Sequence, residues 1–343
     1  MSSKSVLHLV GSPSTQFFYE LSLIYAQGVF CPTGFRFTYL VVAPDSRWFL
    51  TEDLDELGPA LTLGEVVSQL QSEDFHFAVP HIFCEVGLTT VRGLIQNLVG
   101  IPLVGSPPEA TTVSASKLLT VSLAQSVGVL TAGTKALREE ELESPELLDF
   151  PLVVKPDRAD NSEGLSLVHS PNELESAYWK AKEAGDLVVT ETFIPGREIR
   201  AAVVLRQGEL QLLPVIEYHV SKEHPLRLAE DKLDFSKDGL PVSQVSRTEV
   251  GRSIPADLSD GLLQKVHEAC KKVHLALGCR HFSLFDFRVH EETGDLYFLE
   301  AGLFWSFTPQ SMISQMIVSD GTDLGPYIAE RWREWFGSTS APA

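Results

Sequence analysis

The chain has 343 residues, of which 44% are apolar and 21% charged, a composition too rich in core-forming side chains for an intrinsically disordered protein. Acidic residues outnumber basic residues by 46 to 27, which gives a formal net charge of -19. Because Lys and Arg are what bind phosphate-dense surfaces, this charge argues against nonspecific binding to nucleic acid or to an anionic membrane.

The N-terminus and the cysteines indicate where the chain is located. The stretch Met1–Val10 has one lysine and only a short apolar run, so it does not resemble a signal peptide. No run of about 18 apolar residues predicts a membrane span, and we expect a soluble, cytoplasmic protein. Cys31, Cys84, Cys270 and Cys279 show no closely spaced pair, which favours free thiols over disulfides or a zinc site.

Residues 1–106 alternate short apolar strands with helical segments, a pattern typical of a parallel sheet covered by helices. Strands are expected at 5–10, 37–42, 75–80 and 102–105, and helices at 17–27, 63–71 and 88–98. The turn Gly105–Pro108 closes this N-terminal α/β domain. A helix is expected after it, over 109–126, with Lys117 near its centre.

Two α+β domains are expected to follow. Residues 107–205 form the smaller one, with strands at 152–155, 165–168, 187–194 and 198–205, and a helix that begins in a capping box at Ser170 and Glu173 and runs to Gly185. Residues 206–343 form the larger one. Its expected elements are a strand at 210–218, an amphipathic helix at 258–277 and a hairpin of strands 282–289 and 296–301.

The last hairpin places two carboxylates opposite each other. Antiparallel pairing about a turn centred near Thr293 aligns Asp286 with Glu300, and like charges directly opposed in a sheet are unfavourable unless something neutralises them. Mg²⁺ takes oxygen ligands, usually one or two carboxylates together with substrate phosphates. We therefore interpret the pair as a magnesium site, with a solvated pair at the sheet edge as the alternative.

Two lysines could reach an anionic ligand. Lys155 ends the strand 152–155 just before a polar hairpin tip, and Lys117 lies in the helix 109–126. Each alone also fits an ordinary strand-end or exposed helix lysine. The loop 157–164 contains one glycine and three acids, so it resembles neither a Walker A loop nor a G-x-G-x-x-G turn.

Taken in chain order, several segments of this sequence resemble the ATP-grasp fold of the D-alanine–D-alanine ligase family. The resemblance rests on the strand 153–156, the segment 191–198, and the motifs 285–288 and 298–300. It implies ATP and Mg²⁺ as cofactors, with phosphate contacts from Lys117 and Lys155 and metal ligation by Asp286 and Glu300. It also implies a nucleotide site in which adenine contacts Glu191, Thr192, Phe193 and Ile194, and ribose contacts Glu198.

Three positions depart from the pattern of that family. Gly302 stands where the family has a metal-binding asparagine, and Leu284 replaces an arginine that stabilises the tetrahedral oxyanion. Phe18 stands roughly where a glutamate meets the substrate's amino group. These departures argue against ordinary acyl-phosphate chemistry and against specificity for D-alanine.

A closer resemblance is to the cyanobacterial ATP-grasp ligases of mycosporine-like amino acid biosynthesis. It rests on the segments 8–12, 17–27, 80–84, 283–288 and 303–308. It implies that ATP activates the ring oxygen of mycosporine-glycine and that the amine of serine or threonine displaces phosphate. Addition to such a ring neutralises positive charge instead of creating an oxyanion, which would explain Leu284. Another arginine in the same space, such as Arg288 or Arg252, would contradict this explanation.

We therefore predict an ATP-dependent carbon–nitrogen ligase that joins mycosporine-glycine to an amino acid. The alternatives are a dipeptide ligase of the D-alanine–D-alanine type and a degenerate, non-catalytic ATP-binding protein. Catalytic roles are predicted for Lys155, Arg288 and Ser311, and substrate contacts for Phe304, Trp305, Thr308 and Ser311. The aromatic residues could instead pack between domains, and Ser311 could be only a helix N-cap. Since the family often forms dimers through its N-terminal region, we include a homodimer among the predictions.

Overall fold

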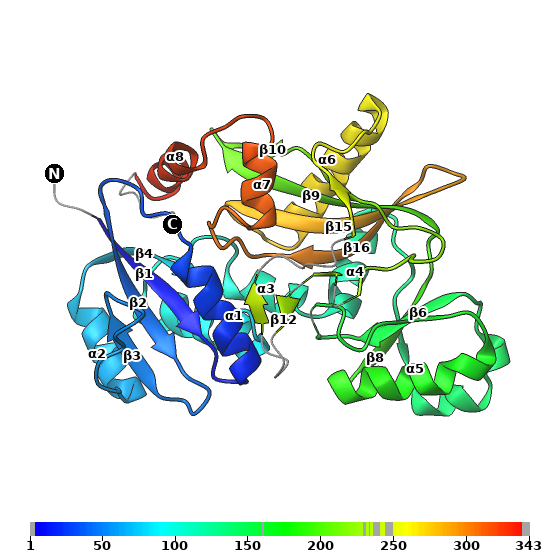
Figure 1. Cartoon of the computed structure of the whole chain (residues 1–343), viewed down its shortest axis with the longest axis horizontal. Coiled ribbons are helices and arrows are strands. Elements are labelled where there is room, and N and C mark those ends of the chain that lie inside the picture. Colours follow the sequence, from blue (N-terminus) through cyan, green and yellow to red (C-terminus); the bar gives the residue numbers. More distant parts are fainter. Residues whose placement is uncertain are drawn as a thin grey trace.

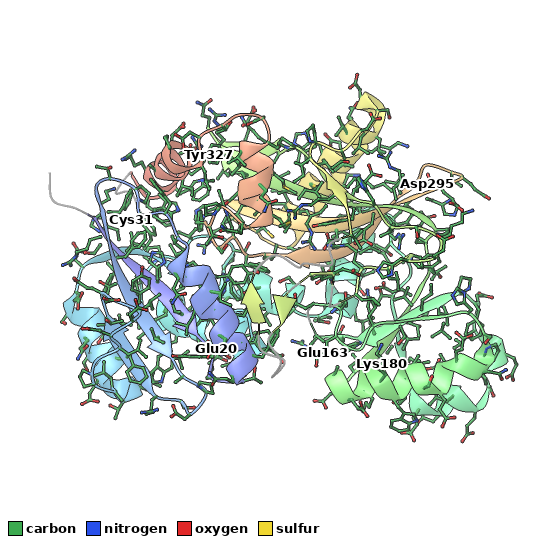
Figure 2. All side chains as sticks on the ribbon, in the orientation of Figure 1. Glu20, Cys31, Glu163, Lys180, Asp295 and Tyr327 are labelled. Carbon is green, nitrogen blue, oxygen red and sulfur yellow. The ribbon has the colours of Figure 1, made fainter. Side chains whose placement is uncertain are left out.

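The computed structural model describes residues 4–159, 161–228, 231–232, 234–235, 241–243 and 250–337. Figure 1 shows an N-terminal unit in blue and cyan beside a small green unit, with a large sheet, coloured from yellow-green to orange, lying across both. In Figure 2, Glu163 lies close to where these units meet, whereas Asp295 lies at the end of a hairpin. Within the described residues, no helix is both long enough and apolar enough to cross a bilayer, and all four cysteines are free thiols.

The N-terminal sheet has the strand order β3-β2-β1-β4, and β1 pairs in parallel with both β2 and β4. The predicted parallel sheet is therefore confirmed for three strands, while β3 adds an antiparallel edge that the sequence did not indicate. Leu103 makes only an isolated bridge to Ala78 in place of the last expected strand. The elements are β1 (Lys4–Gly11), α1 (Gln16–Gln27), β2 (Phe35–Val42), β3 (Trp48–Thr51), α2 (Leu63–Ser72), β4 (Phe75–Pro80), and the π-helical η1 (Gly87–Val91) and η2 (Leu94–Val99).

The helix expected over 109–126 is two helices, α3 (Pro108–Ser114) and α4 (Lys117–Ser126). The break occurs at Ser116, whose backbone is extended and whose hydroxyl accepts a hydrogen bond from the N–H of Leu119. Asp157 adds a second cap, because its carboxylate accepts from the N–H of Leu118 at 2.8 Å. Lys117 therefore begins a helix instead of lying at its centre.

The small unit is an antiparallel sheet of strand order β5-β8-β6-β7, covered by α5. The helix ends before Gly185 as predicted, but its capping box is incomplete. Ser170 donates its hydroxyl to the Glu173 carboxylate and makes no side-chain cap to the backbone. The elements are β5 (Lys135–Leu137), η3 (Glu139–Glu143), η4 (Pro145–Leu147), β6 (Leu152–Pro156), β7 (Ser166–Val168), α5 (Pro171–Ala184) and β8 (Val188–Thr192).

The large sheet is antiparallel, with strand order β14-β11-β9-β15-β16 and β10 paired to β9. The strand expected at 198–205 is β9, which pairs with β15 and so belongs to this sheet instead of the small unit. The strand expected at 210–218 is two strands. The elements are β9 (Gly196–Arg206), β10 (Glu209–Leu212), β11 (Ile216–Tyr218), β12 (Asp234–Phe235), β13 (Pro241–Ser243), β14 (Arg252–Ser253), α6 (Asp260–Ala276), β15 (Phe282–His290), β16 (Leu296–Gly302), α7 (Met312–Val318) and α8 (Leu324–Phe336).

An aromatic core joins the N-terminal unit to the large sheet. Trp332 of α8 lies edge-on to Phe35 and Phe77 of the N-terminal sheet, with ring centroids 5.4 Å apart in both pairs. It also contacts Phe307 at 5.3 Å. The small unit instead packs its own cluster of buried residues between α5 and its sheet. The N-terminal unit and the large sheet thus share one core, and the small unit has a separate one.

Candidate active site

The predicted pairing of Asp286 with Glu300 is confirmed, because the two residues are direct partners in the ladder between β15 and β16. The register shifts immediately after this pair, since Phe287 faces Phe298 and Leu299 is left as a bulge. On the other side, Asp286 faces Arg200 of β9. Three charged residues therefore form one row across three neighbouring strands.

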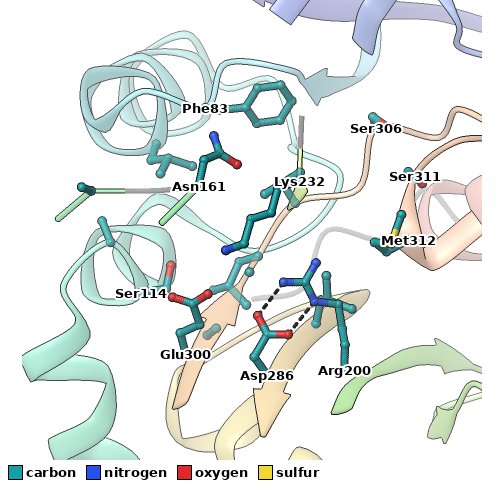
Figure 3. Close-up of a pocket in the computed structure, with 18 of the residues that line it drawn as sticks. Phe83, Ser114, Asn161, Arg200, Lys232, Asp286, Glu300, Ser306, Ser311 and Met312 are labelled. Carbon is teal, nitrogen blue, oxygen red and sulfur yellow. Dashed lines mark hydrogen bonds and ion pairs between the residues drawn. The ribbon is translucent and has the colours of Figure 1, made fainter. Parts of the chain in front are cut away.

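Arg200 holds the Asp286 carboxylate with two hydrogen bonds, from Nε at 2.5 Å and from Nη2 at 2.6 Å (Figure 3). Burial alone would lower the pKa of Arg200, but Asp286, Tyr218 and Glu300 outweigh burial and raise it well above its ordinary value. Burial raises the pKa of Asp286 in spite of Arg200. A buried carboxylate that sits beside a second one needs this compensating charge.

Glu300 is surrounded by cations. Burial would raise its pKa, but Lys117, Lys232 and Lys155, together with Arg200, lower it to about 2. Figure 3 shows the Lys232 side chain extending toward Glu300. This concentration of positive charge is what a polyphosphate requires, and the carboxylates within it could share a divalent cation with that phosphate.

Two cavities meet at the carboxylate pair. The central cavity, about 410 Å³, lies between the N-terminal unit and the large sheet and is bordered by Phe83, Leu284 and Ser311. The side cavity, about 100 Å³, lies between the small unit and the large sheet. The charged residues that border both cavities are Lys117, Glu163, Arg227, Lys232, Asp286 and Glu300.

The side cavity brings together every residue predicted to contact a nucleotide. They are Lys117, Lys155, Glu191, Thr192, Phe193, Ile194 and Glu198. Lys155 pairs with Glu191 at 2.6 Å, both side chains are buried, and the hydroxyl of Thr134 donates to the other oxygen of Glu191. Glu198 accepts a hydrogen bond from Arg227 at 2.7 Å. The two buried acids are thus already neutralised before any ligand is considered.

Arg288 lies on the side of the nucleotide residues, away from Leu284. Its guanidinium donates to the carbonyls of Pro225 at 2.8 Å and Gly196 at 2.9 Å, and it borders the side cavity. Arg200 and Arg252, by contrast, border the central cavity together with Leu284. Two arginines therefore border the same cavity as Leu284, which weakens the explanation of Leu284 by the absence of an arginine, and the catalytic role of Arg288 stays a prediction.

Arg200, Arg227 and Lys232 were missed in the sequence. Arg200 stands on β9, and only the long-range pairing of β9 with β15 shows that it faces Asp286. Arg227 and Lys232 lie between the strand expected at 210–218 and the helix expected at 258–277, where the sequence analysis predicts no site residue. A lysine in a loop carries no periodic signal, so composition could not have singled it out.

The two aromatic residues predicted to bind substrate, Phe304 and Trp305, both border the central cavity but differ in their packing. Trp305 is only 2% exposed, stacks on Phe307 at 4.2 Å and donates its indole N–H to the Ser314 hydroxyl. Its alternative role in core packing is therefore confirmed, and because Trp305 also borders the central cavity, its contact with a ring substrate stays a prediction. Phe304 borders the central cavity, with its ring 4.7 Å from that of Phe83 and 6.3 Å from that of Tyr25.

The two hydroxyl residues also differ in position. Thr308 is fully buried and contacts the Ser306 hydroxyl at 3.0 Å, so we remove it from the substrate contacts. Ser311 is the N-cap of α7, accepting from the N–H of Ser314, and it also borders the central cavity. Its cap role is confirmed, and its contact with an amino-acid substrate stays a prediction.

The family model described as the D-ala D-ala ligase C-terminus matches residues 119–330, a span that includes the carboxylate pair and most of the side cavity. The chain belongs to the D-alanine–D-alanine ligase family. It is an ATP-grasp ligase that forms a carbon–nitrogen bond, as its relatives are.

Relatives in this family match most of the chain. A D-alanine–D-alanine ligase from Desulfotalea psychrophila is 30% identical over 77% of this chain and 79% of its own length. One from Chlorobium luteolum is 28% identical over 94% of both chains. Among solved structures, the D-Ala:D-Ser ligase from Enterococcus faecalis has a TM-score of 0.75 at 23% identity, covering 96% of this chain and 99% of that chain. This likeness confirms the predicted ATP-grasp fold.

The carboxylate pair fits the Mg²⁺ that ATP-grasp ligases use in general. Asp286 and Glu300 offer anionic oxygens on neighbouring strands, and Mg²⁺ completes its shell with phosphate oxygens and water. Among the described residues, no group of three or more His, Cys, Asp and Glu side chains forms a metal site. Because Mg²⁺ is usually bound by one or two carboxylates together with substrate phosphates, the pair would share the ion with a nucleotide. The ion would neutralise charge on the phosphates.

Proposed function

We propose that this ligase phosphorylates a carboxylate oxygen of one amino acid and joins it to the amino group of a second, as a dipeptide ligase of the D-alanine–D-alanine type. The observation that carries the proposal is the position of Asp286 and Glu300, which border both cavities. A nucleotide in the side cavity would present its terminal phosphate at this pair. A substrate in the central cavity would meet it there, and such alignment lowers the barrier to phosphate transfer.

The positive side chains divide between the two halves of the reaction. Lys117, Lys155 and Lys232 would hold the phosphates, because all three act on Glu300. Arg200 and Arg252 would face the acyl group, since both border the central cavity. When the amine attacks the acyl phosphate, the C–N bond forms, negative charge grows on the carbonyl oxygen, and phosphate leaves with the electrons of the C–O bond. An arginine near that oxygen stabilises the developing charge.

The second candidate is the joining of mycosporine-glycine to serine or threonine, with ATP activating the ring oxygen. The observation that favours it is the aromatic wall of the central cavity, formed by Tyr25, Phe83 and Phe304. A planar ring stacks on such a wall better than the methyl group of alanine does. In this reaction, the wall would contact the ring and Ser311 would contact the amino acid.

One substrate panel separates the two candidates. Purified protein is incubated with ATP and Mg²⁺, either with D-alanine alone or with mycosporine-glycine and serine or threonine, and ADP and product mass are measured. We expect a D-alanine dipeptide with one ADP per peptide bond, and no ADP from the Glu300→Gln variant. A ring product without dipeptide would replace the proposal by the second candidate. ADP release from neither mixture would contradict both candidates.

A further inference from the structure

Arg200 engages both oxygens of a predicted metal ligand. Its Nε donates to Oδ1 of Asp286 at 2.5 Å and its Nη2 donates to Oδ2 at 2.6 Å, as the dashed lines in Figure 3 show. The guanidinium carbon also lies 5.7 Å from the centre of the Tyr218 ring. All three side chains border the central cavity, so this ion pair stands in the wall of the active site, where a ligand can reach it.

The second carboxylate of the site lies among cations as well. Arg200, Lys117 and Lys232 all border the central cavity with Glu300, and Figure 3 shows Lys232 extending toward that carboxylate. Despite burial, these cations and Lys155 lower the pKa of Glu300 to about 2. Each carboxylate of the predicted metal site thus has positive protein charge beside it.

Positive charge at this position affects a free metal ion and a phosphate in opposite ways. A divalent cation on an oxygen of Asp286 would be a close neighbour of the guanidinium and would be repelled by it. The guanidinium leaves room for the ion, because a carboxylate has about four lone-pair positions and Arg200 takes two of them. A polyphosphate, by contrast, is attracted by the same charge and brings the negative charge that the ion needs.

We propose that Arg200 makes the site bind Mg²⁺ together with nucleotide phosphates and not as a free ion. The inference rests on the nucleotide site of the proposed function, and it gives Arg200 a positioning role in addition to its place beside the acyl group. By neutralising Asp286, the guanidinium lowers the affinity of the carboxylate pair for a free ion. By attracting phosphate, it raises the affinity for the nucleotide. Removing its charge should therefore shift the two affinities in opposite directions.

Two binding measurements on purified protein test this proposal without turnover. The EPR signal of Mn²⁺ measures binding of the free ion in the absence of nucleotide, and calorimetry in EDTA measures binding of a non-hydrolysable ATP analogue. We expect Arg200→Gln to bind Mn²⁺ about tenfold more tightly than the unmodified protein, and the analogue about tenfold more weakly. A merely structural role would weaken both or change neither, and equal Mn²⁺ affinities of the variant and the unmodified protein would overturn the proposal.

Arg197→Gln is the matched control. Arg197 lies on the same strand and forms a similar pair of hydrogen bonds with Glu217 but borders neither cavity, so its loss should change neither affinity. If Arg200→Gln does not fold, the unmodified protein decides, because tight binding of Mn²⁺ without nucleotide would overturn the proposal, and Mn²⁺ bound only with the analogue would support it. An analogue that binds neither in EDTA nor with Mg²⁺ would instead contradict the nucleotide site itself, and with it the proposed function.

Discussion

At the scale of single residues, the buried pair of Lys155 and Glu191 serves both stability and ligand binding. We expect Lys155→Met to weaken ATP use and to lower the free energy of unfolding by about 3 to 5 kcal/mol, because it leaves the Glu191 carboxylate buried without a partner. The double variant with Glu191→Gln should recover most of the stability but not the ATP affinity. Urea unfolding and the KM for ATP measure the two effects. Unchanged ATP affinity in the single variant would remove Lys155 from the nucleotide site.

Phe304 and Trp305 are adjacent in sequence but differ in what their removal should cost. Trp305→Ala should destabilise the protein by about 3 to 5 kcal/mol, because it empties a packed site in the core. Phe304→Ala should raise the KM of the substrate in the central cavity by about tenfold, which corresponds to about 1.4 kcal/mol of lost contact. Kinetics and thermal unfolding of both variants give the comparison. If Trp305→Ala instead changes only the substrate KM, our assignment of the two rings is reversed.

At the scale of elements, the start of α4 positions a phosphate-binding residue. Asp157 accepts from the N–H of Leu118 and from the Ser116 hydroxyl, which fixes Lys117 at the first position of the helix. We expect Asp157→Ala to cost about 1 to 2 kcal/mol of stability and to raise the KM for ATP several-fold. Ser259→Ala is the matched control, because it removes the N-cap of α6, which borders neither cavity. If both variants change the KM for ATP equally, the start of α4 has no specific role in nucleotide binding.

The elements also show what the sequence could and could not predict. The hairpin β15–β16 and its opposed carboxylates were predictable because a local turn sets their register. The pairing of β9 with β15 was not, since it places Arg200 beside Asp286, which lies 86 residues further along the chain. The division of α3 from α4 was missed because it depends on Asp157, which lies 39 residues further along the chain than Leu118. Local sequence patterns were therefore enough to predict the two carboxylates, Asp286 and Glu300. The position of Arg200 depends on tertiary contacts that those patterns do not contain.

At the scale of the whole molecule, buried histidines should make the fold sensitive to acid. Burial lowers the pKa of His81 and of His281 to about 3, and that of His274 to about 4. His8 pairs with His81 through ring nitrogens 2.9 Å apart, and burial holds its pKa well below the ordinary value. The unfolded chain takes up these protons near pH 6.5, whereas the folded protein does not until much lower pH.

Stability should therefore fall as the pH decreases from about 6.5 toward 4, by up to about 1.4 kcal/mol per pH unit for each such histidine. Urea unfolding at pH 7, 6 and 5 measures this slope, and His81→Gln should make it shallower. A free energy of unfolding that stays constant between pH 7 and pH 5 would show that these rings are protonated in the folded state.

The homodimer remains a prediction, and light scattering at neutral pH would measure the oligomeric state.

Transfer of the terminal phosphate of ATP to a substrate oxygen is the step that the carboxylate pair and its surrounding cations would serve. The most direct measurement uses D-alanine labelled with ¹⁸O in its carboxylate, with ATP and Mg²⁺, and follows the label into inorganic phosphate by ³¹P NMR. We predict that each phosphate released with a peptide bond carries one ¹⁸O atom, because the labelled oxygen leaves with the phosphate when the amine attacks. Phosphate without label, formed alongside ADP, would mean that water receives the phosphoryl group and would contradict ligation through an acyl phosphate.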